Sequence, residues 1–79
     1  MIIMVRVVIT GRGSKGFTFA VNDDRGKRTL DEGKATKIGN KKYKIKFKKL
    51  NIEYEDYLTK TNASRRIKEA YEFFKKHKR

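Results

Sequence analysis

Apolar and polar residues alternate along much of the first fifty positions, and this period of two is typical of β-strands with one buried face. The β-branched run at residues 2–10 predicts a first strand with Val5 and Ile9 on one face and Arg6 on the other. A glycine-rich turn separates it from a second predicted strand at residues 17–22. Both strands are expected to turn their apolar faces toward one core.

A hairpin is predicted in the middle of the chain, after a short third strand at residues 27–30. Its arms are residues 34–38 and 41–48, and Gly39-Asn40 between them is typical of two-residue turns. Because side chains alternate along a strand, the second arm places Tyr43, Ile45 and Phe47 opposite a row formed by Lys42, Lys44, Lys46 and Lys48. The pair Lys48-Lys49 breaks the alternation, and a bulge or a strand end is expected there.

The last part of the chain contains one clear helix. Residues 52–60 mix acidic residues with two tyrosines, and their pattern fits either a helical turn or a connector. Residues 62–77 then predict a helix, capped by Thr61 or Asn62, whose apolar stripe consists of Ala63, Ile67, Ala70, Tyr71 and Phe74.

These elements predict an α+β fold that is mainly β, a small antiparallel sheet or open barrel of four to five strands followed by one C-terminal helix. A chain of 79 residues is expected to form a single domain, residues 1–79, without room for a deep substrate cavity. Since there is no Cys and a single His, no disulfide, metal or cofactor site is expected. Arg6 interrupts the apolar N-terminal run, so no secretory or membrane-spanning segment is predicted.

The charge of the chain indicates an acidic partner. The net charge is +13, whereas a magnitude of roughly 2 to 8 suffices to keep a small domain soluble. Residues 33–50 hold eight Lys and no acidic residue, while residues 51–60 are acidic overall. Such a charge attracts polyanions, and nucleic acid is the first candidate, ahead of a membrane surface and an acidic protein.

The lysine row of residues 41–48 has two interpretations. Lys often keeps exposed strands soluble and protects sheet edges. Four like charges about 6.5–7 Å apart repel one another, however, and phosphates would neutralise them. We therefore predict a surface that contacts nucleic-acid phosphates with little sequence preference, because Lys acts as a point charge. Its expected residues are Lys42, Lys44, Lys46 and Lys48, extended by Lys37, Lys41, Arg12 and Lys15, with Arg6, Arg65 and Arg66 as further candidates.

Two patterns suggest enzymatic sites, and turn chemistry explains the glycines of the first and the aspartates of the second better. Gly11–Gly16 matches G-x-G-x-x-G, but a strand follows it instead of the helix that a dinucleotide site requires. Glycines in a turn that needs positive φ account for it, although its backbone N–H groups could still grip a phosphate. Glu32-Gly33-Lys34, with Asp23 or Asp24 upstream, resembles the E-x-K of metal-dependent nucleases. The chain is too small for the usual nuclease core, and turn chemistry explains the Asp pair better. We expect no enzymatic activity and no small-molecule substrate.

The order of elements, a hairpin and a small sheet before a basic helix, is similar to that of the small basic archaeal chromatin proteins. It also resembles the arm-binding domain of tyrosine recombinases, a three-stranded sheet followed by a helix. Either resemblance implies that the sheet face meets duplex DNA, and neither assigns a role to a residue. The long first strand and the acidic residues 51–60 depart from both patterns.

Duplex DNA is thus the expected partner, with RNA, for instance beside a ribosome, as the second choice. A protein-interaction or viral accessory factor with an acidic partner is the alternative from another class. The protein is expected to act as a monomer or homodimer in the cytoplasm, on the nucleoid if it binds DNA, with no membrane partner.

Overall fold

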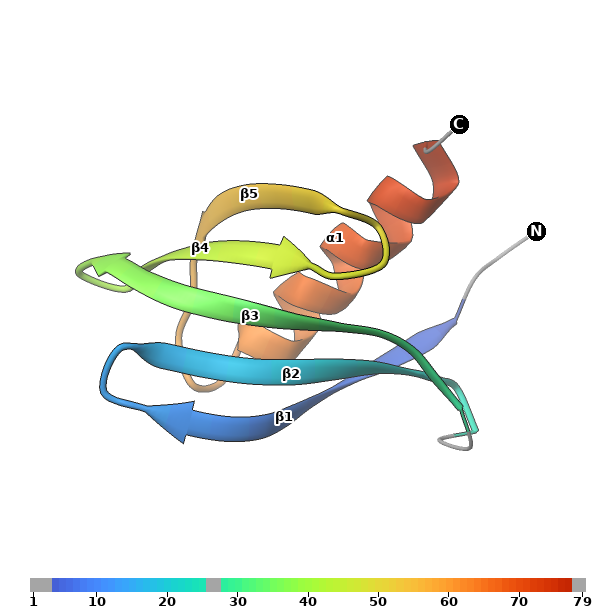
Figure 1. Cartoon of the computed structure of the whole chain (residues 1–79), viewed down its shortest axis with the longest axis horizontal. Helices are drawn as coiled ribbons and strands as arrows, with labels where there is room; N and C mark the ends of the chain where they lie inside the picture. Colours follow the sequence, from blue (N-terminus) through green and yellow to red (C-terminus); the bar gives the residue numbers. More distant parts are fainter. Residues whose placement is uncertain (1–3, 26–27, 78–79) are drawn as a thin grey trace.

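The computed structural model describes residues 4–25 and 28–77, which form one five-stranded antiparallel sheet followed by one helix (Figure 1). The strands are β1 Val5–Gly13, β2 Gly16–Asp23, β3 Thr29–Gly39, β4 Lys42–Phe47 and β5 Ile52–Tyr57, and the helix is α1 Ala63–His77. Each strand pairs with the next one along the chain, in the order β1-β2-β3-β4-β5, and the sheet does not close. The predicted fold class is confirmed.

The ends of the strands differ from the prediction in several places. β1 continues to Gly13, while residues 2–3 of the predicted strand lie outside the described residues. The strands predicted at residues 27–30 and 34–38 are one continuous strand, β3, because the residues between them stay paired to β2. Residue 27 itself lies outside the described residues.

Residues 52–57, whose sequence pattern fitted either a helical turn or a connector, form the edge strand β5. Its side chains alternate, so that Ile52 and Tyr54 pack against the core while Glu53 and Glu55 are exposed. The acidic segment therefore adjoins the lysines of β4 in the sheet, residue by residue along antiparallel strands.

The hairpin between β3 and β4 turns one residue later than predicted. Asn40 and Lys41 form the turn in place of Gly39-Asn40, and Lys41 adopts a positive φ of 62°. The register also shifts between Lys37 and Gly39, which makes Ile38 an extra residue in β3. β4 ends at Phe47, so the strand end predicted near Lys48-Lys49 is confirmed.

A buried carboxylate fixes the turn between β4 and β5. Asp31 is 1% exposed and accepts hydrogen bonds from the backbone N–H groups of Lys49 at 2.7 Å and Leu50 at 3.1 Å, and from Glu32 N–H at 2.7 Å. A charge buried away from water needs such donors to be tolerated. The turn is thereby tied to β3.

The core lies between one face of the sheet and α1, which crosses behind the sheet in Figure 1. Phe47 is at its centre, and the rings of Phe19 and Tyr71 lie with their centroids 5.5 Å from it. The predicted helical stripe is confirmed, since Ala63, Ile67 and Tyr71 are buried. We call the sheet face that packs on α1 the inner face, and the opposite, solvent-facing side the outer face.

A reciprocal pair of hydrogen bonds caps the start of α1. Asn62 Oδ1 accepts from the N–H of Thr59 at 2.7 Å, and Thr59 Oγ1 accepts from the N–H of Asn62 at 3.3 Å. This is a capping-box arrangement, so Thr59 and Asn62 form the cap. The predicted Thr61 contacts it only through its hydroxyl, whose Oγ1 lies 3.1 Å from Thr59 Oγ1. The arrangement places Lys60 in the turn that leads into the helix.

Candidate nucleic-acid interface

The lysine row of β4 lies on the outer face of the sheet. Ile45 and Phe47 are fully buried, whereas Lys44 and Lys46 are exposed, so the predicted alternation is confirmed along the strand. Lys48 follows the end of β4 and is exposed in the turn. The row is therefore shorter than predicted and continues into a loop.

β5 supplies acidic groups that the hairpin itself lacks. Lys42 Nζ lies 3.3 Å from Glu55 Oε1, and Lys44 Nζ lies 3.9 Å from Glu53 Oε1. Residues 33–50 contain no acidic residue, but Lys42 and Lys44 still have counter-charges, because residues 52–57 form a neighbouring strand. Exposed pairs of this kind contribute only about 0–1 kcal/mol, so a phosphate can compete for these lysines.

Three other lysines of the outer face have no such partner. Within residues 4–25 and 28–77, no carboxylate oxygen is found within 4.0 Å of the ammonium groups of Lys34, Lys46 and Lys48. They line one open groove of about 520 Å³, whose lining also includes Thr10, Thr18, Glu32 and Asn51. Ammonium groups beside hydroxyl and amide donors are the groups that contact phosphates in nucleic-acid complexes. We call this groove the outer groove.

The sequence prediction missed Lys34 because of the hairpin register. A turn at Gly39-Asn40 would have paired Lys34 with Ile45 on the inner face. The later turn alone would pair Lys34 with Phe47, which is also on the inner face. The extra residue Ile38 shifts the register by one more position, so that Lys34 pairs with Lys46 on the outer face. The extra residue at Ile38 is therefore the feature that the sequence prediction lacked, and no sequence pattern marks it.

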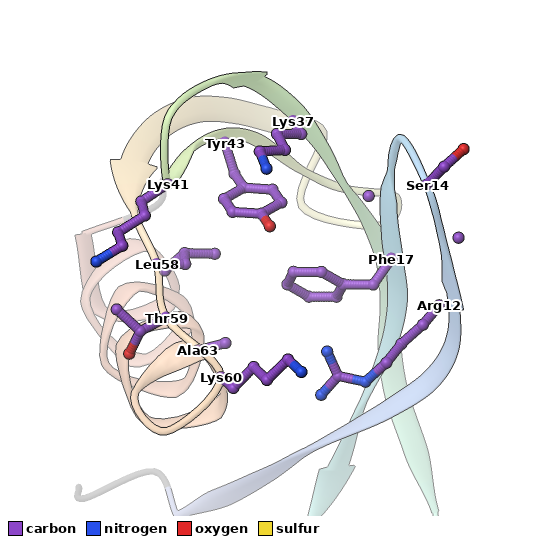
Figure 2. Close-up of a pocket in the computed structure, with 12 residues that line it drawn as sticks. Arg12, Ser14, Phe17, Lys37, Lys41, Tyr43, Leu58, Thr59, Lys60 and Ala63 are labelled. Carbon is purple, nitrogen blue, oxygen red and sulfur yellow. The ribbon is translucent and has the colours of Figure 1, made fainter.

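A second basic cluster lies at the open end of the sheet, where the β1–β2 hairpin, the β3–β4 hairpin and the segment before α1 meet (Figure 2). It is a cavity of about 450 Å³, which we call the mouth. Basic, aromatic and apolar side chains line it: Arg12, Lys37, Lys41, Lys60, Phe17, Tyr43, Leu58 and Ala63, with Ser14 and Thr59. Among the described residues, no acidic side chain belongs to this lining.

A bulge in β1 brings Arg12 to the mouth. The register of β1 shifts after Ile9, which makes Thr10 an extra residue and reverses the alternation beyond it. Arg12 consequently pairs with Phe17 on the inner side, and its guanidinium carbon lies 6.0 Å from the centre of the Phe17 ring. The sequence prediction assumed that Arg12 extends the outer lysine row. Arg12 lies on the inner side instead.

Lys37 also reaches the inner side, because it pairs with Tyr43 in the register of β3 and β4. Figure 2 shows Arg12 and Lys60 pointing toward each other into the cavity, while the ammonium group of Lys41 points away from it. Lys60 is the second basic residue that the sequence prediction missed, since the capped turn that positions it was not foreseen. Of the predicted phosphate surface, the outer groove thus receives Lys46 and Lys48 and the mouth receives Arg12, Lys37 and Lys41. The linings of both cavities leave out Lys15, Lys42 and Lys44.

The remaining predicted contacts lie outside both clusters. Arg6 is exposed on the outer face of β1. Arg65 is exposed on α1, with its Nε 3.9 Å from Glu69 Oε1. Arg66 donates two hydrogen bonds to Asp56. A role in nucleic-acid contact stays a prediction for these three arginines, as it does for every other predicted site residue.

The G-x-G-x-x-G pattern lies in the β1–β2 hairpin, and the predicted positive φ is found at its last glycine, whereas Gly11 and Gly13 lie in β1 without one. Gly16 adopts a φ of 147°, and a Cβ atom at this position would overlap the backbone of Ala35. Lys15 occupies the tip of the turn, where its carbonyl oxygen accepts from the N–H of Lys37 at 2.8 Å. The described residues contain no group of three His, Cys, Asp or Glu side chains that could hold a metal ion. No helix among them is long and apolar enough to cross a membrane.

No protein-family model, no curated protein and no solved structure matches this chain. The resemblances to archaeal chromatin proteins and to the recombinase domain therefore rest on element order and charge alone.

Proposed function

We propose that the protein binds duplex nucleic acid, with DNA ahead of RNA, by contacting phosphates through the outer face of its sheet with little sequence preference. The observation that carries the proposal is the outer groove, where Lys34, Lys46 and Lys48 outnumber the one acidic residue of the described lining, Glu32. None of these lysines has a carboxylate oxygen within 4.0 Å among the described residues. Binding, and no reaction, is the proposed activity.

Electrostatics supports this role. Lys34 and Lys46 are direct partners across β3 and β4, and like charges directly opposite each other destabilise a sheet. A bound phosphate would remove that repulsion. Lysine is a compact point charge that does not fork onto base edges as arginine does, so this groove favours backbone contact over base readout.

A salt titration tests the proposal. For a blunt DNA duplex, the affinity should fall with salt with a log–log slope of magnitude about 4 or more, at ~0.9 per phosphate contact. The triple variant Lys34→Gln, Lys46→Gln, Lys48→Gln should lose about 2.7 of that slope, since each lost contact removes ~0.9. Structured RNA and single strands, titrated in parallel, establish the preferred nucleic acid.

A matched control separates the groove from net charge. Lys68→Gln, Lys75→Gln, Lys76→Gln removes the same charge from α1 and should leave most of the slope in place. Equal losses in the two triple variants would show that charge alone, and not the outer groove, attracts the nucleic acid. A salt-independent affinity would refute phosphate binding altogether.

A further inference from the structure

The mouth gathers basic groups without a compensating acid. Arg12 and Lys60 point toward each other across the cavity (Figure 2), and its described lining residues include no carboxylate. Two cations held face to face repel each other unless an anion lies between them. The geometry therefore favours an anionic group between Arg12 and Lys60.

Aromatic rings form another wall of the same cavity. The Phe17 and Tyr43 ring centroids are 5.5 Å apart, and their planes are tilted by 57°. A flat ligand can consequently stack on one ring while it meets the other at an angle. Tyr43 is the accessible ring, since it is half-buried whereas Phe17 is 7% exposed and belongs to the core.

An anion site beside an aromatic ring fits a nucleotide, which joins a phosphate to a flat base. The cavity volume of about 450 Å³ lies within the roughly 300–1,000 Å³ of ligand pockets. We propose that the mouth binds one unpaired nucleotide, with its base on the Tyr43 ring and its phosphate between Arg12 and Lys60. If the nucleotide is the end of a nucleic-acid strand, this inference rests on the proposed nucleic-acid binding.

A basic path connects the mouth to the outer groove. A third depression, of about 330 Å³, lies over the β1–β2 turn and is lined by Arg12, Lys15 and Lys34. Lys34 also lines the outer groove, and Arg12 also lines the mouth. A strand that leaves a duplex on the outer face can therefore pass over the hairpin tip, beside Lys15, and place its last nucleotide in the mouth.

Duplexes that differ only in a short single-stranded overhang test the strand-end form. The overhang should raise the affinity about tenfold over a blunt duplex, because base–aromatic stacking contributes at this scale. Tyr43→Leu should remove this preference and leave the blunt-duplex affinity unchanged, and Tyr43→Phe should retain it. The double variant Arg12→Gln, Lys60→Gln changes exposed residues only and should likewise remove the preference.

Free adenosine monophosphate tests the mouth without any duplex. In an NMR titration it should shift the resonances of Tyr43 and Lys60, and the Arg12→Gln, Lys60→Gln variant should lose these shifts. Shifts without an overhang preference would identify free nucleotides as the source. If inorganic phosphate caused the same shifts at the same concentration, base stacking would be refuted, and the absence of both shifts and preference would overturn the proposal.

The two proposals fail separately. The triple variant Lys34→Gln, Lys46→Gln, Lys48→Gln should weaken blunt and overhang duplexes by the same factor, and so preserve the ratio that the mouth creates. If wild-type protein bound no duplex but still bound adenosine monophosphate at the mouth, the outer-groove proposal alone would fall.

Discussion

Arg66 on α1 holds Asp56 on β5 through two parallel hydrogen bonds, from Nε to Oδ2 and from Nη2 to Oδ1, each 2.8 Å long. Such two-point pairs are stronger and more directional than single contacts. The pair joins the helix to the edge strand beside the capped turn that carries Lys60. Arg66 thus has a structural partner, and a phosphate would have to displace Asp56 to reach it.

Removal of this pair should make the fold less stable in a pH-dependent way. The hydrogen bonds from Arg66 lower the pKa of Asp56 below its ordinary value, and the backbone N–H of Tyr57 adds to this effect. The stabilisation is complete above the ordinary carboxyl pKa near 3.8, and it is lost as the pH falls through the lowered pKa. Asp56→Asn should therefore melt a few degrees lower at pH 7, with a smaller difference in acid.

Thermal melts of both proteins from neutral to acidic pH measure this difference. Glu69→Gln serves as the control, because its carboxylate lies 3.9 Å from the exposed Arg65 and such pairs contribute little. A difference between Asp56→Asn and wild type that stayed constant down to strong acid would contradict the assignment.

The hydroxyl of Tyr54 is buried without a hydrogen-bond partner among the described residues. Burial, followed by the nearby charge of Asp56, raises the pKa of Tyr54 well above its ordinary value of about 10. A raised pKa means that stability is complete below about pH 10 and falls as the unfolded chain ionises above it. Tyr54→Phe keeps the ring packed against Phe47 and Phe74 and removes the unpaired group.

We expect Tyr54→Phe to be as stable as wild type at pH 7 or more stable by up to about 1 kcal/mol. Above pH 10 it should lose less stability than wild type does. Urea unfolding at both pH values gives the comparison, with Tyr57→Phe as the control because Tyr57 is 62% exposed. A clear loss of stability in Tyr54→Phe at pH 7 would show that the hydroxyl has a partner.

Most of the fold could be predicted because its strands have one buried face. The alternation of Ile45 and Phe47 with Lys44 and Lys46 survives in β4 without change. β5 could not be assigned, because its acidic and aromatic residues are neither β-branched nor clearly apolar. Their strand conformation depends on pairing with β4, which is a tertiary contact.

The candidate site could be predicted only in part, because single extra residues decide which face a side chain occupies. The bulge at Thr10 moves Arg12 to the inner side, and the extra residue Ile38 in β3 moves Lys34 to the outer side. Composition and charge carry no information about either shift. The sequence therefore identified most of the basic residues that line the two clusters, while their division between the outer groove and the mouth required the structure.

Gly33 has no side chain, and this leaves room for the ring of Phe19 to pack against β3. A Cβ atom at this position would overlap the ring of Phe19 and the carbonyl oxygen of Lys46. Gly33→Ala should therefore cost about 1–3 kcal/mol of folding stability through overpacking. Gly39→Ala is the matched control, because its Cβ would meet only Lys42 Cβ at 3.5 Å and should change stability by about 0.5 kcal/mol or less.

Denaturant unfolding of the two alanine variants measures this contrast. Equal stabilities would mean that β3 can move away from Phe19 at no cost. In that case Lys34 and Lys46 could not be held in fixed register, and the outer groove would lose its geometric basis.

The acidic residues of β5 should weaken nucleic-acid binding, because Glu55 and Glu53 form ion pairs with Lys42 and Lys44. Glu53→Gln, Glu55→Gln frees both lysines at the margin of the outer groove. The affinity for a blunt duplex should rise several-fold, and the salt slope should steepen by up to about 1.8, since each new phosphate contact adds ~0.9. Fluorescence anisotropy over a series of salt concentrations measures both quantities.

The helix offers the matched control for this last prediction. Glu69→Gln, Glu72→Gln makes the same change in net charge on α1, away from the outer face, and acts on the duplex only through the long-range field. Because salt screens that field over about 10 Å at 0.1 M, the control should raise the affinity less and leave the slope nearly unchanged. If the two double variants gave the same slope, the lysines beside β5 would not be at the interface.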